Sequence, residues 1–128
     1  MRIAEVSQKY DITADTLRYY ERIGLIPPVN RNVSGIRDYT EEDCNWVHFI
    51  KCMRGAGLSI EVLVEYVTMF QQGNSTIKAR KELLIEQRNQ LAKKVKEMQQ
   101  TLERLDKKID GYEERVLVKE DKLKRTDE

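Results

Sequence analysis

Residues 16–27 read TLRYYERIGLIP, a short charged and aromatic segment that ends abruptly. Arg18, two tyrosines and Glu21 fill one helical turn, so a cation, two phenol rings and a carboxylate share a small surface. Gly24 tolerates the positive φ that ends many helices, and the two prolines at 27–28 prevent the helix from resuming. The pattern therefore predicts a short exposed helix of defined length, with a turn directly behind it.

A second short helix is predicted just before this segment. Residues 3–10 place Ile3 and Val6 on one apolar face, and residues 11–12 interrupt the pattern. Thr13 is a good N-cap for the helix that follows. Two short helices joined by a tight turn form a helix-turn-helix, an arrangement that can place its second helix in the major groove of DNA.

The residues that follow predict a hairpin and two further helices. Residues 30–39, NRNVSGIRDY, form a turn-rich segment between β-prone pieces, which is typical of a wing lying along a sugar-phosphate backbone. Thr40 with Asp43 is a capping box that begins one helix, and Ser59 caps the next. The apolar positions expected to face the core from these two helices are Trp46, Phe49, Ile50, Met53, Leu63, Val67 and Phe70.

Three motifs together resemble the MerR family of bacterial transcription regulators. They are RYYE at residues 18–21, GLIP at 24–27 and GLSIE at 57–61. The resemblance covers residues 1–72 and implies that they form a winged helix-turn-helix domain that binds duplex DNA. It also implies a regulator that bends and untwists a promoter for RNA polymerase, at an elastic cost on the order of 1–10 kcal/mol.

A long amphipathic helix is expected over residues 77–118, after a polar linker at 73–76. Its apolar side chains alternate at three- and four-residue intervals, which is the a/d seam of a coiled coil. A narrow apolar stripe needs a partner in water, and no other helix of the chain is long enough to fold back over it. We therefore expect a homodimer, and the family resemblance implies antiparallel pairing. The seam residues are Leu84, Leu91, Val95, Met98, Leu102, Leu105, Ile109, Tyr112 and Val116.

The expected fold is thus mostly α, with a winged helix-turn-helix DNA-binding domain followed by a long dimerising coiled-coil helix. Residues 119–128 are expected to form a charged, disordered tail.

The candidate DNA contacts lie on the second helix and the wing. Arg18 and Tyr19 can reach phosphates and base edges, and arginines in the wing can reach phosphates. Two alternatives stay open: Arg22 can instead pair with an acid, and Tyr39 can pack the wing onto the domain. The full set of candidates is Thr16, Arg18, Tyr19, Arg22, Arg31, Arg37 and Tyr39.

Cys44, His48 and Cys52 share one helix face at intervals of four residues, which raises the question of a metal site. Eight helical residues separate the two cysteine Cα atoms by about 12 Å, which is too far for a disulfide or for joint ligation of one zinc ion. One cysteine and His48 supply only two ligands. The sequence therefore predicts neither a metal nor a cofactor.

Cys52 is the candidate sensor residue. The segment FIKCMR at 49–54 resembles the NmlR-like subgroup of MerR regulators, which sense aldehydes and other electrophiles through one cysteine. Lys51, Arg54 and His48 are sequence neighbours that can favour the reactive thiolate. The alternative is that Cys52 is a small hydrophobic side chain in the core. Cys44 follows three acidic residues and is interpreted as structural.

Composition limits the other classes of function. The chain has 128 residues, of which 35% are charged, a net charge of +1 and a mean hydropathy of −0.66. No apolar run approaches the roughly 20 residues of a membrane span, and no signal peptide is recognisable, so we expect a cytoplasmic protein without a membrane partner. An enzyme is disfavoured, because there is one histidine, no catalytic cluster and no glycine-rich phosphate loop.

The function predicted from the sequence is that of a promoter-distorting transcription regulator, switched by thiol modification at Cys52. One alternative is an effector-free coiled-coil or architectural DNA-binding protein. Another is a MerR-type regulator that responds to a small ligand. The family's drug-binding members carry a separate ligand domain after the coiled coil, for which this chain leaves little room after Val116.

Overall fold

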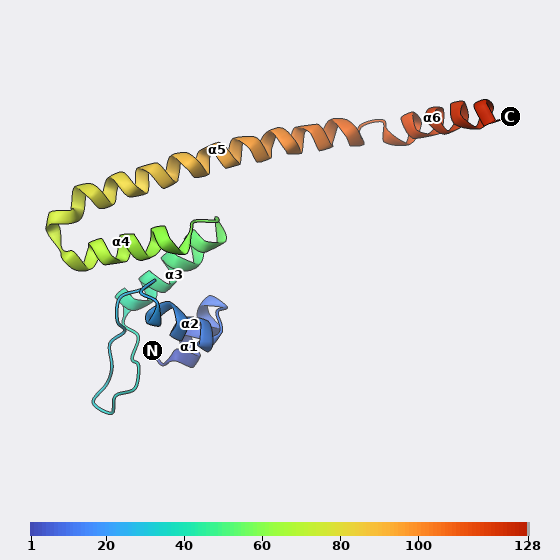
Figure 1. Cartoon of the computed structure of the whole chain (residues 1–128). Coiled ribbons are helices and arrows are strands. Elements are labelled where there is room, and N and C mark those ends of the chain that lie inside the picture. The colour runs from blue at the N-terminus through green and yellow to red at the C-terminus, as the bar shows by residue number, and fades with distance from the viewer. Residues whose placement is uncertain (128) are drawn as a thin grey trace. The chain divides into compact units, whose positions relative to one another are not determined.

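The computed structural model describes residues 1–127 and is mainly helical (Figure 1). Its backbone divides into two compact units, Met1–Gln87 and a second unit that begins at Arg88. The elements are α1 (Ile3–Tyr10), α2 (Ala14–Arg22), α3 (Glu41–Gly55), α4 (Ile60–Gln72), the 3-10 helix η1 (Asn74–Thr76), α5 (Ile77–Ile109) and α6 (Tyr112–Asp127). The mostly α architecture expected from the sequence is confirmed.

The helix starts follow the predicted caps. The Thr13 hydroxyl accepts the backbone N–H of Thr16 at 3.1 Å, and the Ser59 hydroxyl accepts that of Val62 at 3.2 Å. Thr40 forms a complete capping box with Asp43, whose carboxylate accepts the Thr40 N–H at 2.9 Å. These bonds satisfy N–H groups that have no partner inside a helix, so local sequence determines where α2, α3 and α4 begin.

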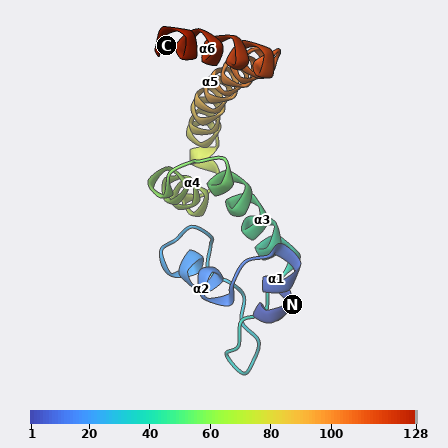
Figure 2. The ribbon, with the colours of Figure 1, turned by 90° about the vertical axis from the view of Figure 1, so that its right-hand side faces the viewer.

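The tight geometry of the first two helices depends on two left-handed residues. Asp11 ends α1 with φ 53° and Gly24 follows α2 with φ 81°. The α1 and α2 ribbons lie side by side in both views (Figure 1 and Figure 2), as a helix-turn-helix requires. The predicted stop at Gly24 is therefore confirmed.

The core of the first unit lies between these two helices and α3 and α4. Its buried side chains are Val6, Ile12, Leu17, Leu25, Ile26, Val29, Tyr39, Cys44, Val47, Ile50, Leu58, Leu63 and Val67. The buried face of α3 is rotated from the expected one, because Cys44 and Val47 lie inside with Ile50, while Trp46, Phe49 and Met53 are only half-buried. Phe70 on α4 is also half-buried.

The expected wing is a loop rather than a two-stranded hairpin. Within residues 1–127 its only β pairing is one antiparallel bridge between Arg31 and Arg37. Two backbone bonds close the loop, from the Asn32 N–H to the Ile36 carbonyl at 2.9 Å and from the Asp38 N–H to the Asn30 carbonyl at 2.7 Å. The loop projects away from α1 and α2 (Figure 2).

The long helix differs from the uninterrupted element expected over 77–118. The structure ends α5 at Ile109 and begins α6 at Tyr112, with Gly111 at φ 65° between them. The heptad spacing continues across this break, which is why the pattern alone gave no sign of it. Residues 119–127 continue α6, whereas a disordered tail was expected; Glu128 lies outside the described residues. No helix of the described part is long and apolar enough to cross a membrane.

Candidate nucleic-acid interface and cysteine site

The exposed side of α2 carries the residues predicted to contact DNA. Arg18 is half-exposed and forms an ion pair with Asp15 at 2.8 Å. Tyr19 is 37% exposed, and the Arg22 guanidinium carbon lies 5.5 Å from the centre of its ring. The Thr16 hydroxyl is 2.8 Å from that of Thr13 at the start of the helix. These contacts order the four side chains without removing them from solvent.

The wing arginines are held by bonds within the domain. Nε of Arg37 donates to Oε1 of Glu21 at 2.7 Å, and the second oxygen of Glu21 accepts the backbone N–H of Val29 at 2.7 Å. Arg31 donates through Nη1 to the carbonyl oxygen of Gly35 at 2.9 Å. The base of the wing is therefore joined to α2 by one carboxylate, and both guanidiniums have fixed positions.

A concave surface of about 510 Å³ lies between α1, α2 and the wing. Four arginines contribute to its lining, together with small and apolar side chains. Arg18 and Arg37 are paired with Asp15 and Glu21, whereas Arg2 and Arg31 form no salt bridge among the described residues, so the surface carries an excess of positive charge. Such a surface matches the phosphate backbone of a nucleic acid. The lining residues are Arg2, Ile3, Ala4, Arg18, Arg31, Ile36 and Arg37.

Arg2 was missed by the sequence reasoning. It precedes α1 and has no motif around it, and only the folded chain places it beside the wing. The N-terminus itself is tied to the same region, because the Met1 ammonium group donates to the Asp38 carboxylate at 3.1 Å and to the Tyr39 carbonyl at 2.9 Å.

Tyr39 is the buried candidate among the predicted DNA contacts. Its side chain is 2% exposed, and its buried hydroxyl has no hydrogen-bond partner among the described residues. Burial raises the pKa of Tyr39, and Arg37 nearby lowers it to a smaller extent. This burial supports the alternative that Tyr39 packs the wing onto the domain, and its role as a DNA contact stays a prediction. Burial also raises the pKa of Tyr20, which packs against the core.

Cys52 lies on the exposed side of α3, whereas Cys44 is buried in the core. The Cys52 sulfur is 3.7 Å from Nε2 of His48, whose ring packs at 5.8 Å from that of Tyr10. The other two basic neighbours bond elsewhere: Lys51 donates to the Tyr10 carbonyl and Arg54 to the Leu58 carbonyl at 2.7 Å. His48 is thus the one polar neighbour that the described structure places in contact with the Cys52 thiol.

The fold and the arginine-lined groove are those of a helix-turn-helix DNA-binding protein, and family comparison agrees. Residues 1–69 match the MerR HTH family regulatory protein model, and residues 45–108 match the model for MerR, DNA binding. The chain belongs to the MerR family of transcription regulators, which confirms the resemblance drawn from its motifs.

Two individual relatives show how similar this chain is to known members of the family. The HTH-type transcriptional regulator AdhR of Bacillus subtilis is 60% identical over 91 residues, covering 71% of this chain and 65% of AdhR, so the match spans slightly less than two thirds of that protein. A MerR family regulator from Listeria monocytogenes shares 47% identity at a TM-score of 0.86, covering 99% of this chain and 96% of that one.

A third relative indicates which subgroup of the family this chain resembles. HiNmlR, a MerR family regulator lacking the sensor domain and solved bound to promoter DNA, has a TM-score of 0.81 and 28% identity, covering 88% of this chain and 90% of that one. Together with AdhR it confirms the resemblance to the NmlR-like subgroup. These relatives are named transcriptional regulators rather than enzymes.

Proposed function

We propose that this protein binds promoter DNA as a homodimer and distorts it to control transcription by RNA polymerase. The observation that carries the proposal is the concave surface on which Arg2, Arg18, Arg31 and Arg37 converge beside the exposed side of α2. Arginines on such a surface can neutralise phosphates, and the Tyr19 and Thr16 side chains on α2 can reach base edges. The solved complex of HiNmlR with promoter DNA supports the same use of the fold.

The test for DNA binding is the affinity of the full chain for the promoter region of its own gene. Arg18→Ala and Tyr19→Ala should each weaken specific binding by at least about fivefold, because a good base contact contributes roughly 1–3 kcal/mol. Lys78→Ala, an exposed cation on α5, is the control and should bind as wild type. Unchanged specific affinity in both α2 variants would contradict the assignment.

Dimerisation is proposed from the second unit. The seam of α5 and α6 is exposed in the single chain, with Met98 at 72%, Leu102 at 58% and Ile109 at 67%. Large exposed apolar side chains in a regular stripe mark a surface that another chain covers. Leu102→Asp should convert the dimer to a monomer in sedimentation experiments, while Gln100→Asp, an exposed position outside the seam, should not.

The antiparallel orientation has its own test. In a parallel, in-register pair every seam residue meets its own copy, whereas in an antiparallel pair only residues near the two-fold axis do. Cysteines placed singly at Leu84, Met98 and Val116, in a chain with Cys44→Ser and Cys52→Ser, distinguish the two. Cross-linking at Leu84 and Val116 would indicate parallel helices; its absence at both ends indicates antiparallel ones.

We further propose that modification of Cys52 switches the dimer between two forms on DNA. The thiol is exposed and lies beside His48, which can accept its proton. With an aldehyde, the thiolate sulfur bonds to the carbonyl carbon, the C=O π bond breaks, and its oxygen takes up a proton. Cys52 lies in the last turn of α3, so an adduct there can alter how that helix end packs.

In vitro transcription from the protein's own promoter tests this switch. A small aldehyde should induce transcription with the wild type but not with Cys52→Ser. Cys44→Ser is the control and should still respond, because the Cys44 thiol is buried in the wild type. Equal induction in the Cys52 variant would make the thiol irrelevant. Binding without any induction would favour the alternative of an effector-free architectural protein.

A further inference from the structure

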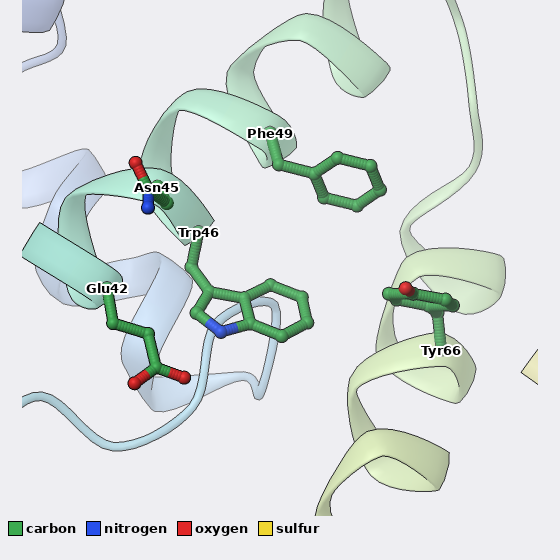
Figure 3. Close-up of a pocket in the computed structure, with 5 residues that line it drawn as sticks. All are labelled: Glu42, Asn45, Trp46, Phe49 and Tyr66. Carbon is green, nitrogen blue, oxygen red and sulfur yellow. The ribbon is translucent and has the colours of Figure 1, made fainter. Parts of the chain in front are cut away.

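A hollow lined by aromatic rings lies between α3 and α4, separate from both Cys52 and the arginine-lined groove (Figure 3). Its volume is about 210 Å³. The ring centres of Trp46 and Phe49 are 6.1 Å apart, those of Trp46 and Tyr66 6.0 Å, and those of Phe49 and Tyr66 5.7 Å. Three π systems therefore border one small space.

A carboxylate borders the same space. Glu42 precedes Trp46 by four residues on α3, so the two side chains lie on one face of the helix, and Figure 3 shows the carboxylate beside the indole. Among the described residues Glu42 forms no salt bridge. The hollow thus combines three aromatic side chains with an exposed carboxylate that forms no salt bridge among the described residues.

The same aromatic cluster already holds one cation. The ring of Phe70 lies 4.9 Å from that of Trp46, and the Arg80 guanidinium carbon lies 5.4 Å from the centre of the Phe70 ring. This contact joins α4 to the start of α5. Arg80 also donates to the Thr76 hydroxyl at 3.0 Å, so the contact shows only that a cation is accommodated beside this cluster.

We propose that this hollow binds a small organic cation of the quaternary ammonium class. Such a cation is drawn to ring faces by their quadrupoles, and Glu42 supplies the opposite charge. A neutral ligand leaves the carboxylate uncompensated. A cationic ligand satisfies both the rings and the carboxylate.

Tryptophan fluorescence measures the binding directly, because Trp46 is the one tryptophan of the chain. The full-length protein is titrated with choline chloride, with total ionic strength held constant by sodium chloride so that screening does not change. The matched neutral probe is 3,3-dimethylbutan-1-ol, which has the same shape without the charge. Choline should give a saturable change, and the alcohol should bind at least about tenfold more weakly.

Three variants separate this site from general surface effects. Glu42→Gln should weaken choline binding by at least about threefold, while Glu41→Gln, an exposed carboxylate in the same helical turn, should match the wild type. Tyr66→Leu keeps apolar volume but removes one ring and should also weaken binding. Circular dichroism shows whether each variant folds. If one does not, the other variant and the comparison of choline with the alcohol still test whether the hollow binds a cation.

Three results would each overturn the proposal. They are an unsaturable response to choline, equal affinity for choline and the neutral alcohol, and equal choline affinity in Glu42→Gln and Glu41→Gln. An unsaturable response would show that choline does not occupy the hollow. Equal affinity for choline and the alcohol would show an apolar cleft without preference for charge.

Discussion

Glu21 and Arg37 are joined across the base of the wing by a hydrogen bond of 2.7 Å from Nε to Oε1. Both side chains are largely buried, at 13% and 24% exposure. The second oxygen of Glu21 accepts the N–H of Val29, so one carboxylate connects α2, the segment that leaves it and the returning arm of the wing. This carboxylate is one of several contacts that fix the wing; Met1 bonds to Asp38 and Tyr39, and Asn30 bonds to Asp43.

Glu21→Ala should lower the free energy of unfolding by about 1.5–3 kcal/mol, because it leaves a half-buried guanidinium and a backbone N–H without their acceptor. Urea denaturation followed by circular dichroism measures the change. The control is Asp15→Ala, which removes the exposed ion pair to Arg18 and should cost less than about 1 kcal/mol. Equal losses in the two variants would mean that the wing does not depend on Glu21.

Arg2→Ala should weaken promoter binding and reduce its dependence on salt. If Arg2 neutralises one phosphate, its removal lowers the slope of log affinity against log salt concentration by about 1, uniformly across DNA sequences. The measurement is fluorescence anisotropy at several salt concentrations on specific and nonspecific duplexes. A slope identical to that of wild type would remove Arg2 from the interface; Lys78→Ala is the matched control and should retain the full slope.

The sequence predicted those features that short-range chemistry determines. The caps at Thr13, Thr40 and Ser59 and the stop at Gly24 each act within a few residues, and the structure has them where they were expected. The family followed from motifs of four or five residues, and comparison with relatives confirmed it.

The features that the sequence did not predict depend on residues that are distant along the chain. Arg2 reaches the concave surface only because α1 packs beside the wing, and Glu21 meets Arg37 across 16 positions. Tyr39 is a candidate DNA contact in the sequence, with packing of the wing as the alternative, and the core of the folded chain buries its side chain. The break at Gly111 falls at an Asp-Gly pair, a turn signal that the expectation of one continuous helix over 77–118 did not take into account.

Tyr39→Phe should stabilise the protein by about 1 kcal/mol at neutral pH, since it removes a buried hydroxyl that lacks a partner. The stability of the wild type should also fall at alkaline pH. Burial raises the pKa of Tyr39 in the folded chain, so above about pH 10 the phenol ionises first in the unfolded chain and unfolding releases the proton. The loss continues as the pH rises through the folded pKa.

Urea midpoints measured from about pH 7 to about pH 11 test both parts, and the variant should show the shallower alkaline decline. Burial also raises the pKa of Tyr20, so the Tyr39→Phe variant should keep part of the alkaline loss of stability. Destabilisation by Tyr39→Phe at neutral pH would show that the hydroxyl makes a stabilising bond in solution.

Gly24→Ala and Gly55→Ala should change stability in opposite directions, although a methyl group meets no atom within 4 Å at either position. Gly24 has φ 81°, where an L-residue is strained by roughly 1–2 kcal/mol, so its replacement should destabilise the domain. Gly55 ends α3 without a positive φ, so alanine there should stabilise by about 0.4–1 kcal/mol by restricting the unfolded chain. Thermal unfolding of both variants under identical conditions measures the difference. Destabilisation by both would show that packing around these glycines, and not the backbone angle of Gly24, governs the effect.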